Sequence, residues 1–341
     1  MSDQLPGALV ISLDFELAWG FGRNAVTEEA CRERILAART IIPQLLDIFE
    51  EFDVAATWAV VGFLFAESRA ELQGLCPHKR PDYRDPDLST YGEEIGEDER
   101  EDPFHFAPSL IRAIQRTPRQ EIATHTFSHY YCLEPGQTKE TFSADIQAAR
   151  AAARRFGIQL HSIAFPRNQH NPEYDEILIE QGITGFRGNP RNWAWRFSDT
   201  RESRKRGKRA LRLIDAYLPM TGVGTVPWED VLQPSGLADV RATRPLSPYR
   251  PEIRHFEEKR FQRIRRGILH AAQNREIFHL WWHPHNFGIF QDHNMAFLRE
   301  VLREATRCRA EYGLRLLSMA DVGRMVRESP TRFSARLTRS R

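Results

Sequence analysis

Cysteine is scarce in this sequence, with four residues in a chain of 341, and no two of them stand at the short spacing of a metal-binding pair. This scarcity argues against a cysteine-based zinc site and leaves no framework for disulfide bonds. Reduced thiols in a cytoplasmic protein are the simplest interpretation. The four cysteines are Cys31, Cys76, Cys132 and Cys308.

Long hydrophobic runs and an excess of one charge are also lacking. The longest apolar stretch, residues 54–65, is too short to cross a membrane, and the start of the chain does not resemble a secretory signal. The 48 Lys and Arg side chains face 46 Asp and Glu, so the net charge of +2 gives no reason to expect a nucleic-acid partner. We therefore expect a cytoplasmic protein without a transmembrane span, with peripheral contact to the inner membrane as the alternative.

The chain instead alternates short apolar runs with longer amphipathic stretches. Residues 8–13, 54–61 and 276–282 predict buried strands, whereas residues 29–52 and 293–312 carry apolar side chains at helical spacing. The repeated order of strand and then helix predicts a parallel sheet, either in a barrel or doubly wound. Further strands are predicted over 121–124, 162–165, 184–186 and 314–317, and further helices over 138–156, 173–181 and 254–273.

Two stretches interrupt this alternation. Residues 67–106 are rich in Pro, Asp, Glu and Arg, and residues 196–251 are first basic and then punctuated by Pro and Gly. Neither has the apolar content for a core of its own. We therefore expect one domain over residues 1–327 with two insertions, which can build a substrate pocket, and a flexible basic tail over residues 328–341.

Side chains that can carry chemistry stand at the ends of the predicted strands, where α/β folds place their active sites. The first strand leads to Asp14 and Glu16, two carboxylates at alternate positions that would face one cavity. A later strand leads to His125 and His129, whose spacing puts both imidazoles on one side of a helical turn, as in some zinc sites. Taken alone, each pair is also explained by solvated acids, a helix cap or structural histidines.

Two more segments place a side chain that can carry chemistry at the end of a predicted strand. Arg167 stands just past the strand predicted over 162–165 and can hold a carboxylate ionised through charge-assisted hydrogen bonds. His283 ends an apolar strand and can donate a proton near neutral pH, with His285 as a competitor for that role. A surface arginine and a structural histidine are the ordinary explanations.

Together and in this order, these segments resemble the polysaccharide deacetylase family (the NodB-homology domain, carbohydrate esterase family 4). Residues 56–62, Ala-Thr-Trp-Ala-Val-Val-Gly, are similar to the second strand of that family, and residues 125–129 match its His-Ser/Thr-x-x-His motif. Residues 165–168, Phe-Pro-Arg-Asn, are similar to its arginine motif, and residues 280–283 to its last strand, which ends in His. The resemblance runs from about residue 10 to residue 318.

The sequence departs from the family pattern in two places. Ser-Leu-Asp-Phe-Glu replaces the usual Thr-Phe-Asp-Asp, which indicates a subfamily with an Asp-x-Glu first motif. Residues 186–195 occupy the place of the fourth motif without its usual Asp, so the partner of the catalytic histidine has no candidate.

The resemblance implies a distorted (β/α)7-type barrel and a metal-dependent N-deacylase. Glu16, His125 and His129 would hold a divalent metal, Zn²⁺ in the first place, with Co²⁺, Ni²⁺ or Mn²⁺ as alternatives. Asp14 would take a proton from water, Arg167 would keep Asp14 ionised, and His283 would protonate the leaving amine. Further substrate contacts are expected from Tyr130, whose backbone N–H would stabilise the oxyanion, and from Asn168, Trp193 and His285.

The implied substrate is an N-acylated amino sugar. A cytoplasmic enzyme does not meet the mature cell wall, so we expect an intermediate of lipopolysaccharide, O-antigen or capsule synthesis, linked to a nucleotide or a polyprenyl carrier. The basic segments 201–212, 259–266 and 332–341 would contact pyrophosphate or anionic lipid, although solvated helix faces and a loose tail explain them equally well. Two alternatives are a hydrolase of cyclic amides or ureides, as in allantoinase-like members, and a catalytically dead carbohydrate-binding relative.

Overall fold

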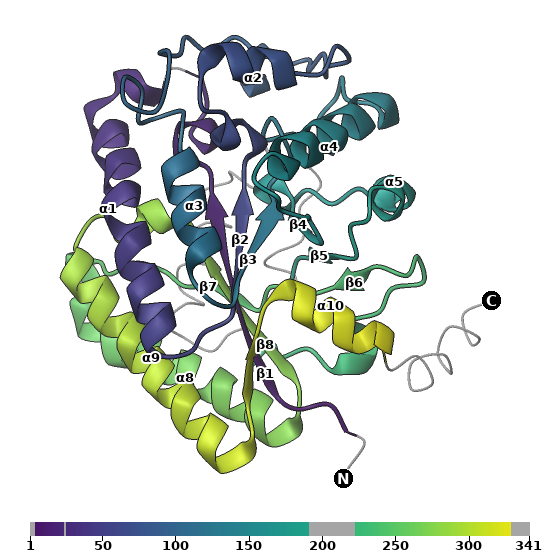
Figure 1. Cartoon of the computed structure of the whole chain (residues 1–341). Helices are drawn as coiled ribbons and strands as arrows, with labels where there is room; N and C mark the ends of the chain where they lie inside the picture. The colour runs from purple at the N-terminus through teal and green to yellow at the C-terminus, as the bar shows by residue number, and fades with distance from the viewer. Residues whose placement is uncertain (1–3, 24, 191–221, 329–341) are drawn as a thin grey trace.

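The computed structural model describes residues 4–23, 25–190 and 222–328. Its centre is a curved parallel sheet in which nine strands are found within these ranges, in the order β6-β5-β4-β3-β2-β1-β8-β7, with β9 beside β1 (Figure 1). The strands are β1 (Ala8–Phe15), β2 (Ala56–Val60), β3 (Gln120–Thr124), β4 (Ser162–Ala164), β5 (Gly185–Arg187), β6 (Ala238–Asp239), β7 (Arg244–Pro245), β8 (Ile277–Trp282) and β9 (Arg315–Leu317).

The strand β1 organises the sheet. All eight of its residues are buried, and it pairs in parallel with β8 over Ala8–Leu13, with β2 over Ser12–Phe15 and with β9 over Ala8–Val10. Both faces of β1 are covered, because Leu9, Ile11 and Leu13 belong to one apolar cluster and Ala8 and Val10 to another. A strand covered on both faces accounts for the almost continuous apolar run at the start of the sequence.

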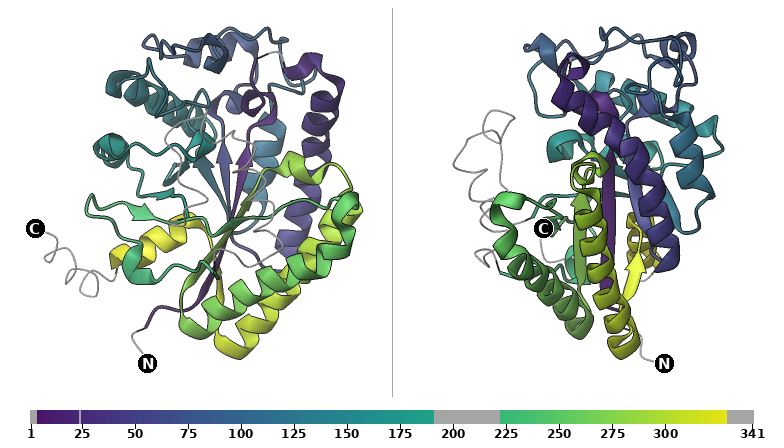
Figure 2. Two further views of the ribbon diagram at one scale, coloured as in Figure 1. Left: turned by 180° about the vertical axis from the view of Figure 1, so that it is seen from behind. Right: turned by 90° about the vertical axis from the view of Figure 1, so that its left-hand side faces the viewer.

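Helices cover the outside of the sheet. In Figures 1 and 2, α1, α8 and α9 lie together next to β1 and β8, whereas α4 and α5 lie on the side of β4 and β5. The helix α10 begins beside β2 and β3, where Thr57 Oγ1 accepts a hydrogen bond from the N–H of Met319 and Glu121 accepts one from Ala320. The helices are α1 (Glu29–Glu51), α2 (Arg69–Leu75), α3 (Pro108–Arg116), α4 (Lys139–Arg154), α5 (Asp175–Glu180), α8 (Glu257–Asn274), α9 (Gln291–Tyr312) and α10 (Met319–Glu328).

The expected α/β class with a distorted barrel of parallel strands is confirmed, because β6 and β7 form the two ends of a sheet that curves around one axis. The first insertion, residues 67–106, contains α2 and lies over the end of the sheet to which β1, β2 and β3 point (Figure 1). The second insertion lies outside the described residues up to residue 221, and its remainder contributes the short strands β6 and β7. All but the first residue of the basic tail also lies outside them.

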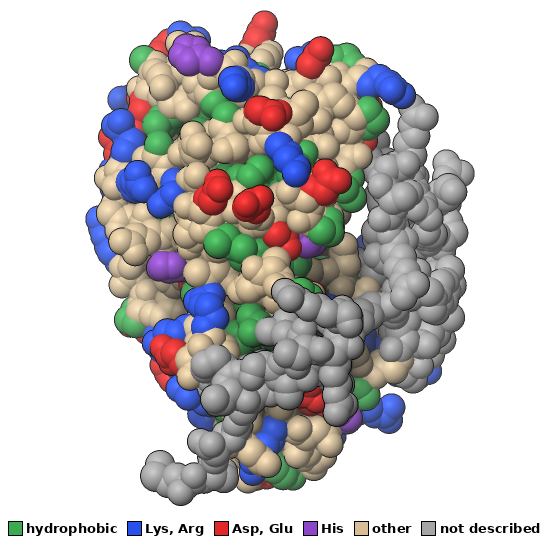
Figure 3. Space-filling view, turned by 90° about the vertical axis from the view of Figure 1, so that its right-hand side faces the viewer, with side chains coloured by type: hydrophobic (Ala, Val, Ile, Leu, Met, Phe, Trp, Pro, Cys, Tyr) green, Lys and Arg blue, Asp and Glu red, His purple; other side chains and the backbone are tan. Residues whose placement is uncertain are grey.

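Charged side chains of both signs lie on one side of the molecule. On the side of the molecule shown in Figure 3, acidic and basic side chains of the described residues are interspersed. Within the expected basic segment 259–266, Arg260 and Arg263 are buried, and Arg260 pairs with Glu257 and lies 3.5 Å over the ring of Phe297. Segments 201–212 and 332–341 lie outside the described residues. Among the described residues, no helix combines the length and the apolar character that crossing a bilayer requires.

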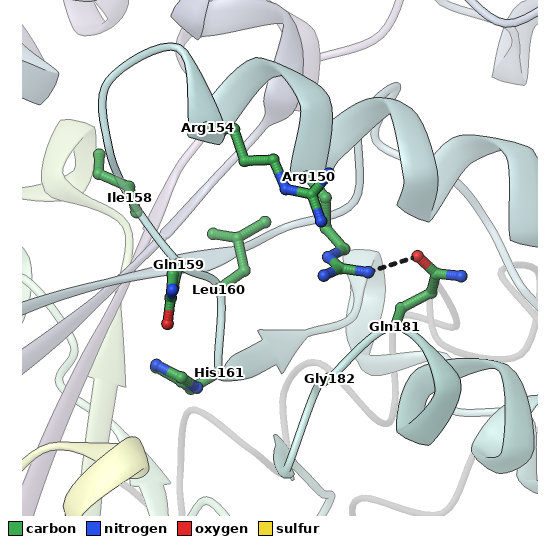
Figure 4. A pocket seen from close by; sticks show the side chains of 8 residues that line it. All are labelled: Arg150, Arg154, Ile158, Gln159, Leu160, His161, Gln181 and Gly182. Carbon is green, nitrogen blue, oxygen red and sulfur yellow. Dashed lines mark hydrogen bonds between the residues drawn. The ribbon is translucent and has the colours of Figure 1, made fainter.

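A cavity of about 240 Å³ lies between the end of α4 and the turn that precedes β5 (Figure 4). Arg150 and Arg154 line one side of it, and a hydrogen bond joins Arg150 to Gln181. Because its other lining residues immediately precede β4 and β5, this cavity is at the amino-terminal end of the strands, opposite to the end at which α/β folds place their active sites.

Candidate active site

The end of β1 brings two carboxylates into one place. Asp14 is the second-to-last residue of β1, and Glu16 directly follows the strand. Both side chains are buried. The Nε2 atom of His283, just past the end of β8, lies 3.7 Å from Asp14 Oδ2 and 3.3 Å from Glu16 Oε1. The alternate spacing therefore places both acids toward the same cavity, as expected from the strand period.

The two histidines after β3 lie in a loop and not on a helical turn, so the expectation of a helix here is wrong. The N–H of His125 continues the sheet by donating to the carbonyl of Val60, and Thr126 and His129 then adopt left-handed φ angles of 64° and 55°. The loop nevertheless turns both imidazoles inward. The Nε2 atoms of His125 and His129 lie 3.0 and 3.3 Å from Glu16 Oε1.

Asp145 of α4 holds this loop from behind. Its buried carboxylate accepts hydrogen bonds from the N–H of Phe127, at 2.7 Å, from the N–H of Ser128, at 3.1 Å, and from the Ser128 hydroxyl. Burial raises the pKa of Asp145 to about 6 in spite of these three donors. Phe127 and Ser128 lie outside any helix or strand, so their N–H groups need a hydrogen-bond acceptor from elsewhere. The carboxylate of Asp145 is that acceptor.

Glu16, His125 and His129 can hold a metal ion. Their ligand atoms all lie within 4.8 Å of one another, and all three side chains are buried. Two imidazole nitrogens and one carboxylate oxygen form the kind of three-residue set that catalytic zinc uses, with a position left for water. Burial raises the pKa of Glu16, but the imidazoles of His283, His125 and His129 outweigh it, so this pKa ends well below its ordinary value.

Asp14 is held by Arg187, the last residue of β5. Nη1 and Nη2 of Arg187 donate to Oδ1 and Oδ2 of Asp14 over 2.6 and 2.7 Å, in a buried bidentate pair. Burial raises the pKa of Asp14, but the Arg187 guanidinium outweighs it, so the pKa stays below its ordinary value. The expectation that Arg167 binds Asp14 is therefore wrong, because its guanidinium instead lies 4.4 Å from the ring centre of Tyr131, from a residue with a left-handed φ of 53°.

The family motifs give Arg187 no role, because residues 186–195 occupy the place of the fourth motif. One signal for it was present in the sequence, since a charged residue directly follows the short apolar strand predicted over 184–186. Its neighbour Phe186 packs in the apolar core, so the strand period turns Arg187 to the inner side of the sheet.

Two expected substrate contacts have other partners. The Asn168 side chain accepts a hydrogen bond from Nη2 of Arg187 at 3.0 Å, so it supports the pair with Asp14. The N–H of Tyr130 donates to Thr126 Oγ1 at 2.6 Å, inside the histidine loop, so its expected contact with an oxyanion stays a prediction. Trp193, the third expected contact, lies outside the described residues.

The two late histidines have different surroundings. The side chain of His283 is 25% exposed and approaches both carboxylates, whereas His285 is buried against the ring of Phe21. Burial lowers the pKa of His283, but the charges of Glu16 and Asp14 outweigh it and this pKa is raised. Burial, with the neighbouring His283, lowers the pKa of His285 to about 3, so His285 is neutral at physiological pH. Trp281, in the preceding strand, lies with its ring 4.5 Å from the guanidinium of Arg187.

Part of this chain matches the model of a known protein family. Residues 33–186 match the family model described as polysaccharide deacetylase, the family that the sequence motifs resemble. The matched range includes His125 and His129 and ends before Arg187 and His283. The subfamily defined by an Asp-x-Glu first motif stays a prediction.

Solved structures share the fold over nearly the whole chain. A protein from Mycobacterium smegmatis named as a polysaccharide deacetylase is 16% identical, with a TM-score of 0.61 over 97% of this chain and 93% of that one. One from Pseudomonas aeruginosa PAO1, named likewise, is 11% identical, with a TM-score of 0.53 over 94% and 91%. The allantoinase PuuE is 11% identical, with a TM-score of 0.54 over 94% and 90%. No curated protein sequence matches the chain.

Proposed function

We propose that this chain is a metal-dependent N-deacylase, a deacetylase or deformylase, that acts on an N-acylated amino sugar. One observation carries the proposal: the buried ligand atoms of Glu16, His125 and His129 converge beside an ionised Asp14 and a partly exposed His283. A protein that only binds carbohydrate does not require a buried, ionised carboxylate that is paired with a buried arginine. The match of residues 33–186 to the polysaccharide deacetylase model supports the same chemistry.

A divalent metal fits the three ligand residues. The Nε2 atoms of the buried His125 and His129 and of the partly exposed His283 lie 3.0, 3.3 and 3.3 Å from a single oxygen of Glu16. When bound, the metal would lower the pKa of a water molecule and polarise the carbonyl of the acyl group. We propose Zn²⁺, because imidazole and carboxylate ligands suit it.

Asp14 acts as the base in this proposal. Its carboxylate is ionised, since Arg187 keeps its pKa low, and it lies next to the ligand Glu16 in the same cavity. An ionised carboxylate within hydrogen-bond reach of the attacking water can accept its proton. Arg187 does not contact that water in this account, and its part is to orient Asp14.

His283 acts as the acid. An amine leaves an amide only when its nitrogen is protonated, and His283 presents Nε2 to the same cavity with an exposed edge. Its pKa is raised by Glu16 and Asp14, which favours the protonated ring. His285 is neutral and lies farther back, so we assign the acid to His283.

We further propose that the sugar is an intermediate of lipopolysaccharide, O-antigen or capsule synthesis, carried on a nucleotide or a polyprenyl group. The partly exposed Trp281 offers an aromatic face beside Arg187 on which an apolar sugar face can pack. The acyl group, acetyl or formyl, is a question for the assay.

The test is the release of acetate or formate from N-acylated amino sugars by the metal-loaded protein, compared with its Asp14→Asn variant. We expect wild-type turnover, and near-complete loss in Asp14→Asn with the metal still bound. Unchanged turnover in Asp14→Asn would remove Asp14 as the base. Release of product only from small cyclic amides would instead favour a ureide hydrolase, and binding of sugars without any turnover would favour a carbohydrate-binding protein.

A further inference from the structure

A line of buried polar side chains continues behind the Asp14–Arg187 pair. Nη1 of Arg187 donates to Ser12 Oγ at 3.1 Å, Ser12 Oγ lies 2.8 Å from Nε2 of His279, and Nδ1 of His279 lies 2.9 Å from the carbonyl oxygen of Val240. Ser12 and His279 are 0% exposed and Arg187 is 1% exposed. Bulk water therefore offers no substitute partner to any member of the line.

The direction of each hydrogen bond in this line is fixed by its chemistry. The carbonyl of Val240 can only accept, so Nδ1 of His279 carries the ring proton. His279 is neutral, because burial and the charge of Arg187 lower its pKa to about 3. Its Nε2 therefore accepts from the hydroxyl of Ser12, and the oxygen of Ser12 is left to accept from Arg187, which can only donate.

These hydrogen bonds fix the orientation of the Arg187 guanidinium. Nη1 donates to Asp14 and to Ser12, and Nη2 donates to Asp14 and to Asn168. Each terminal nitrogen thus has one hydrogen bond to the carboxylate and one to a fixed acceptor on the outer side. Because the guanidinium is a rigid planar fork, two outer acceptors define the orientation in which both inner bonds to Asp14 are straight.

We propose that Ser12 and His279 are positioning residues, which hold Arg187 so that both of its inner hydrogen bonds reach Asp14. The inference rests on the proposed function in one respect, that Asp14 is the base. His279 keeps the hydroxyl of Ser12 turned so that its lone pair meets Nη1. Removal of the Ser12 hydroxyl leaves one N–H of Arg187 buried without an acceptor, and the guanidinium then turns away from Asp14 to find another.

The test compares Ser12→Ala and His279→Leu with the conservative variants Ser12→Thr and His279→Gln. We expect kcat to fall about tenfold in Ser12→Ala, the loss of one hydrogen bond to a charged group, with KM and metal content unchanged. His279→Leu lowers kcat less, and it has no further effect in a Ser12→Ala background, because it acts only through Ser12. Ser12→Thr and His279→Gln, which keep the hydroxyl and an acceptor, recover most of the loss.

Thr57→Val is the matched control. Thr57 is the register partner of Ser12 in the neighbouring strand and is equally buried, but its hydroxyl bonds Glu121 and the start of α10. We expect Thr57→Val to lower the free energy of unfolding without changing kcat. A fall in kcat in Thr57→Val equal to that in Ser12→Ala would mean that any buried strand hydroxyl has this effect, and the positioning role would be lost.

A crystal structure of Ser12→Ala separates this inference from the proposed function. We expect at least one of the two hydrogen bonds between Arg187 and Asp14 to be broken, whether or not the wild-type protein deacylates the sugars tried. If Ser12→Ala does not fold, the structure of His279→Leu gives the same readout. An unchanged Arg187–Asp14 geometry, or wild-type kcat in a folded Ser12→Ala protein, overturns the inference. Absence of wild-type turnover with a disrupted pair in the variant contradicts only the proposed function.

Discussion

Arg187 and Asp14 form a bidentate ion pair although their strands, β5 and β1, are separated by three other strands in the sheet. The two side chains can meet only because the sheet curves, so that strands distant in its order face one another across the interior. The ionised state of Asp14, the proposed base, therefore depends on the curvature of the sheet. A buried carboxylate without such a partner would be strongly disfavoured in its ionised form.

The first prediction concerns this pair. We expect Arg187→Lys to lower kcat about tenfold or more, because an ammonium group cannot form two parallel hydrogen bonds to Asp14. Metal content should be unchanged, since Arg187 is not a ligand. Steady-state kinetics and metal analysis check both. Arg167→Lys is the comparison, and a larger loss of kcat there than in Arg187→Lys would return the role to Arg167.

Gly20 gives a second prediction. A Cβ atom at this position would lie 1.7 Å from Oε2 of Glu16, so Gly20→Ala displaces the carboxylate from the two histidines. We expect metal affinity to fall about 10- to 100-fold, as when the surroundings of a ligand are disturbed. Gly74→Ala, at a helical glycine with open space around it, serves as the control in a calorimetric titration of the metal-free protein. Equal affinities of the two variants would contradict the assigned position of Glu16.

A third prediction addresses the histidine loop. Asp145→Ala leaves the N–H groups of Phe127 and Ser128 buried without acceptors, which costs about 1–3 kcal/mol for each. We expect a lower free energy of unfolding and weaker metal binding, since His125 and His129 flank these two residues. Gln147→Ala, at an exposed position of the same helix, should change neither quantity. Denaturant unfolding and metal titration measure the two effects, and full metal affinity in a destabilised Asp145→Ala protein would confine Asp145 to a role in stability.

The buried histidines predict how stability depends on pH. The folded-state pKa of His279 is about 3, below that of a histidine in the unfolded chain, about 6.5. Below about pH 6.5 the unfolded chain therefore takes up a proton that the folded protein refuses, so stability falls as the pH falls, by about 1.4 kcal/mol per pH unit for one histidine. His285 adds to this effect in the same window.

The check is denaturant unfolding of metal-free protein at pH 7, 6 and 5, with His279→Gln beside the wild type. Between pH 6 and 5 the stability of His279→Gln should fall less steeply, by the share of one proton. Parallel curves for the two proteins would show that folding does not lower the pKa of His279, so that the ring would be protonated in the folded protein below about pH 6.5.

Much of the fold and part of the candidate site follow from local patterns. Apolar runs in the sequence predicted β1, β2, β3 and β8 to within a few residues. The side chains that follow such strands, among them Glu16, His125 and His283, converge because parallel strands end at the same edge of the sheet. The strands β6 and β7 were not predicted, because two-residue strands in a region rich in Pro and Gly carry no period.

The partners of the site residues were harder to predict, because they depend on the curvature of the sheet and on loop conformation. The sequence does not show whether Arg187 or Arg167 is the partner of Asp14, because both stand at the end of a short predicted strand. Only the curvature of the folded sheet brings Arg187, and not Arg167, to Asp14. The left-handed residues Thr126 and His129 are not glycines, so the loop that replaces the expected helical turn left no signal of its own. Asp145 looks like any helix residue until α4 is placed behind that loop.

Metal binding tests the central claim most directly. Protein stripped with a chelator and titrated with Zn²⁺ should bind one equivalent, and His129→Ala and Glu16→Ala should each lose that binding, whereas Asp14→Asn should keep it. Each of the first two variants removes one ligand atom of the proposed set Glu16, His125 and His129, to which Asp14 does not belong, whereas loss of zinc in Asp14→Asn would favour the other set of converging side chains, Asp14, Glu16 and His283. Equal zinc affinity in the wild type, His129→Ala and Glu16→Ala, or no binding by the wild type, would contradict the account.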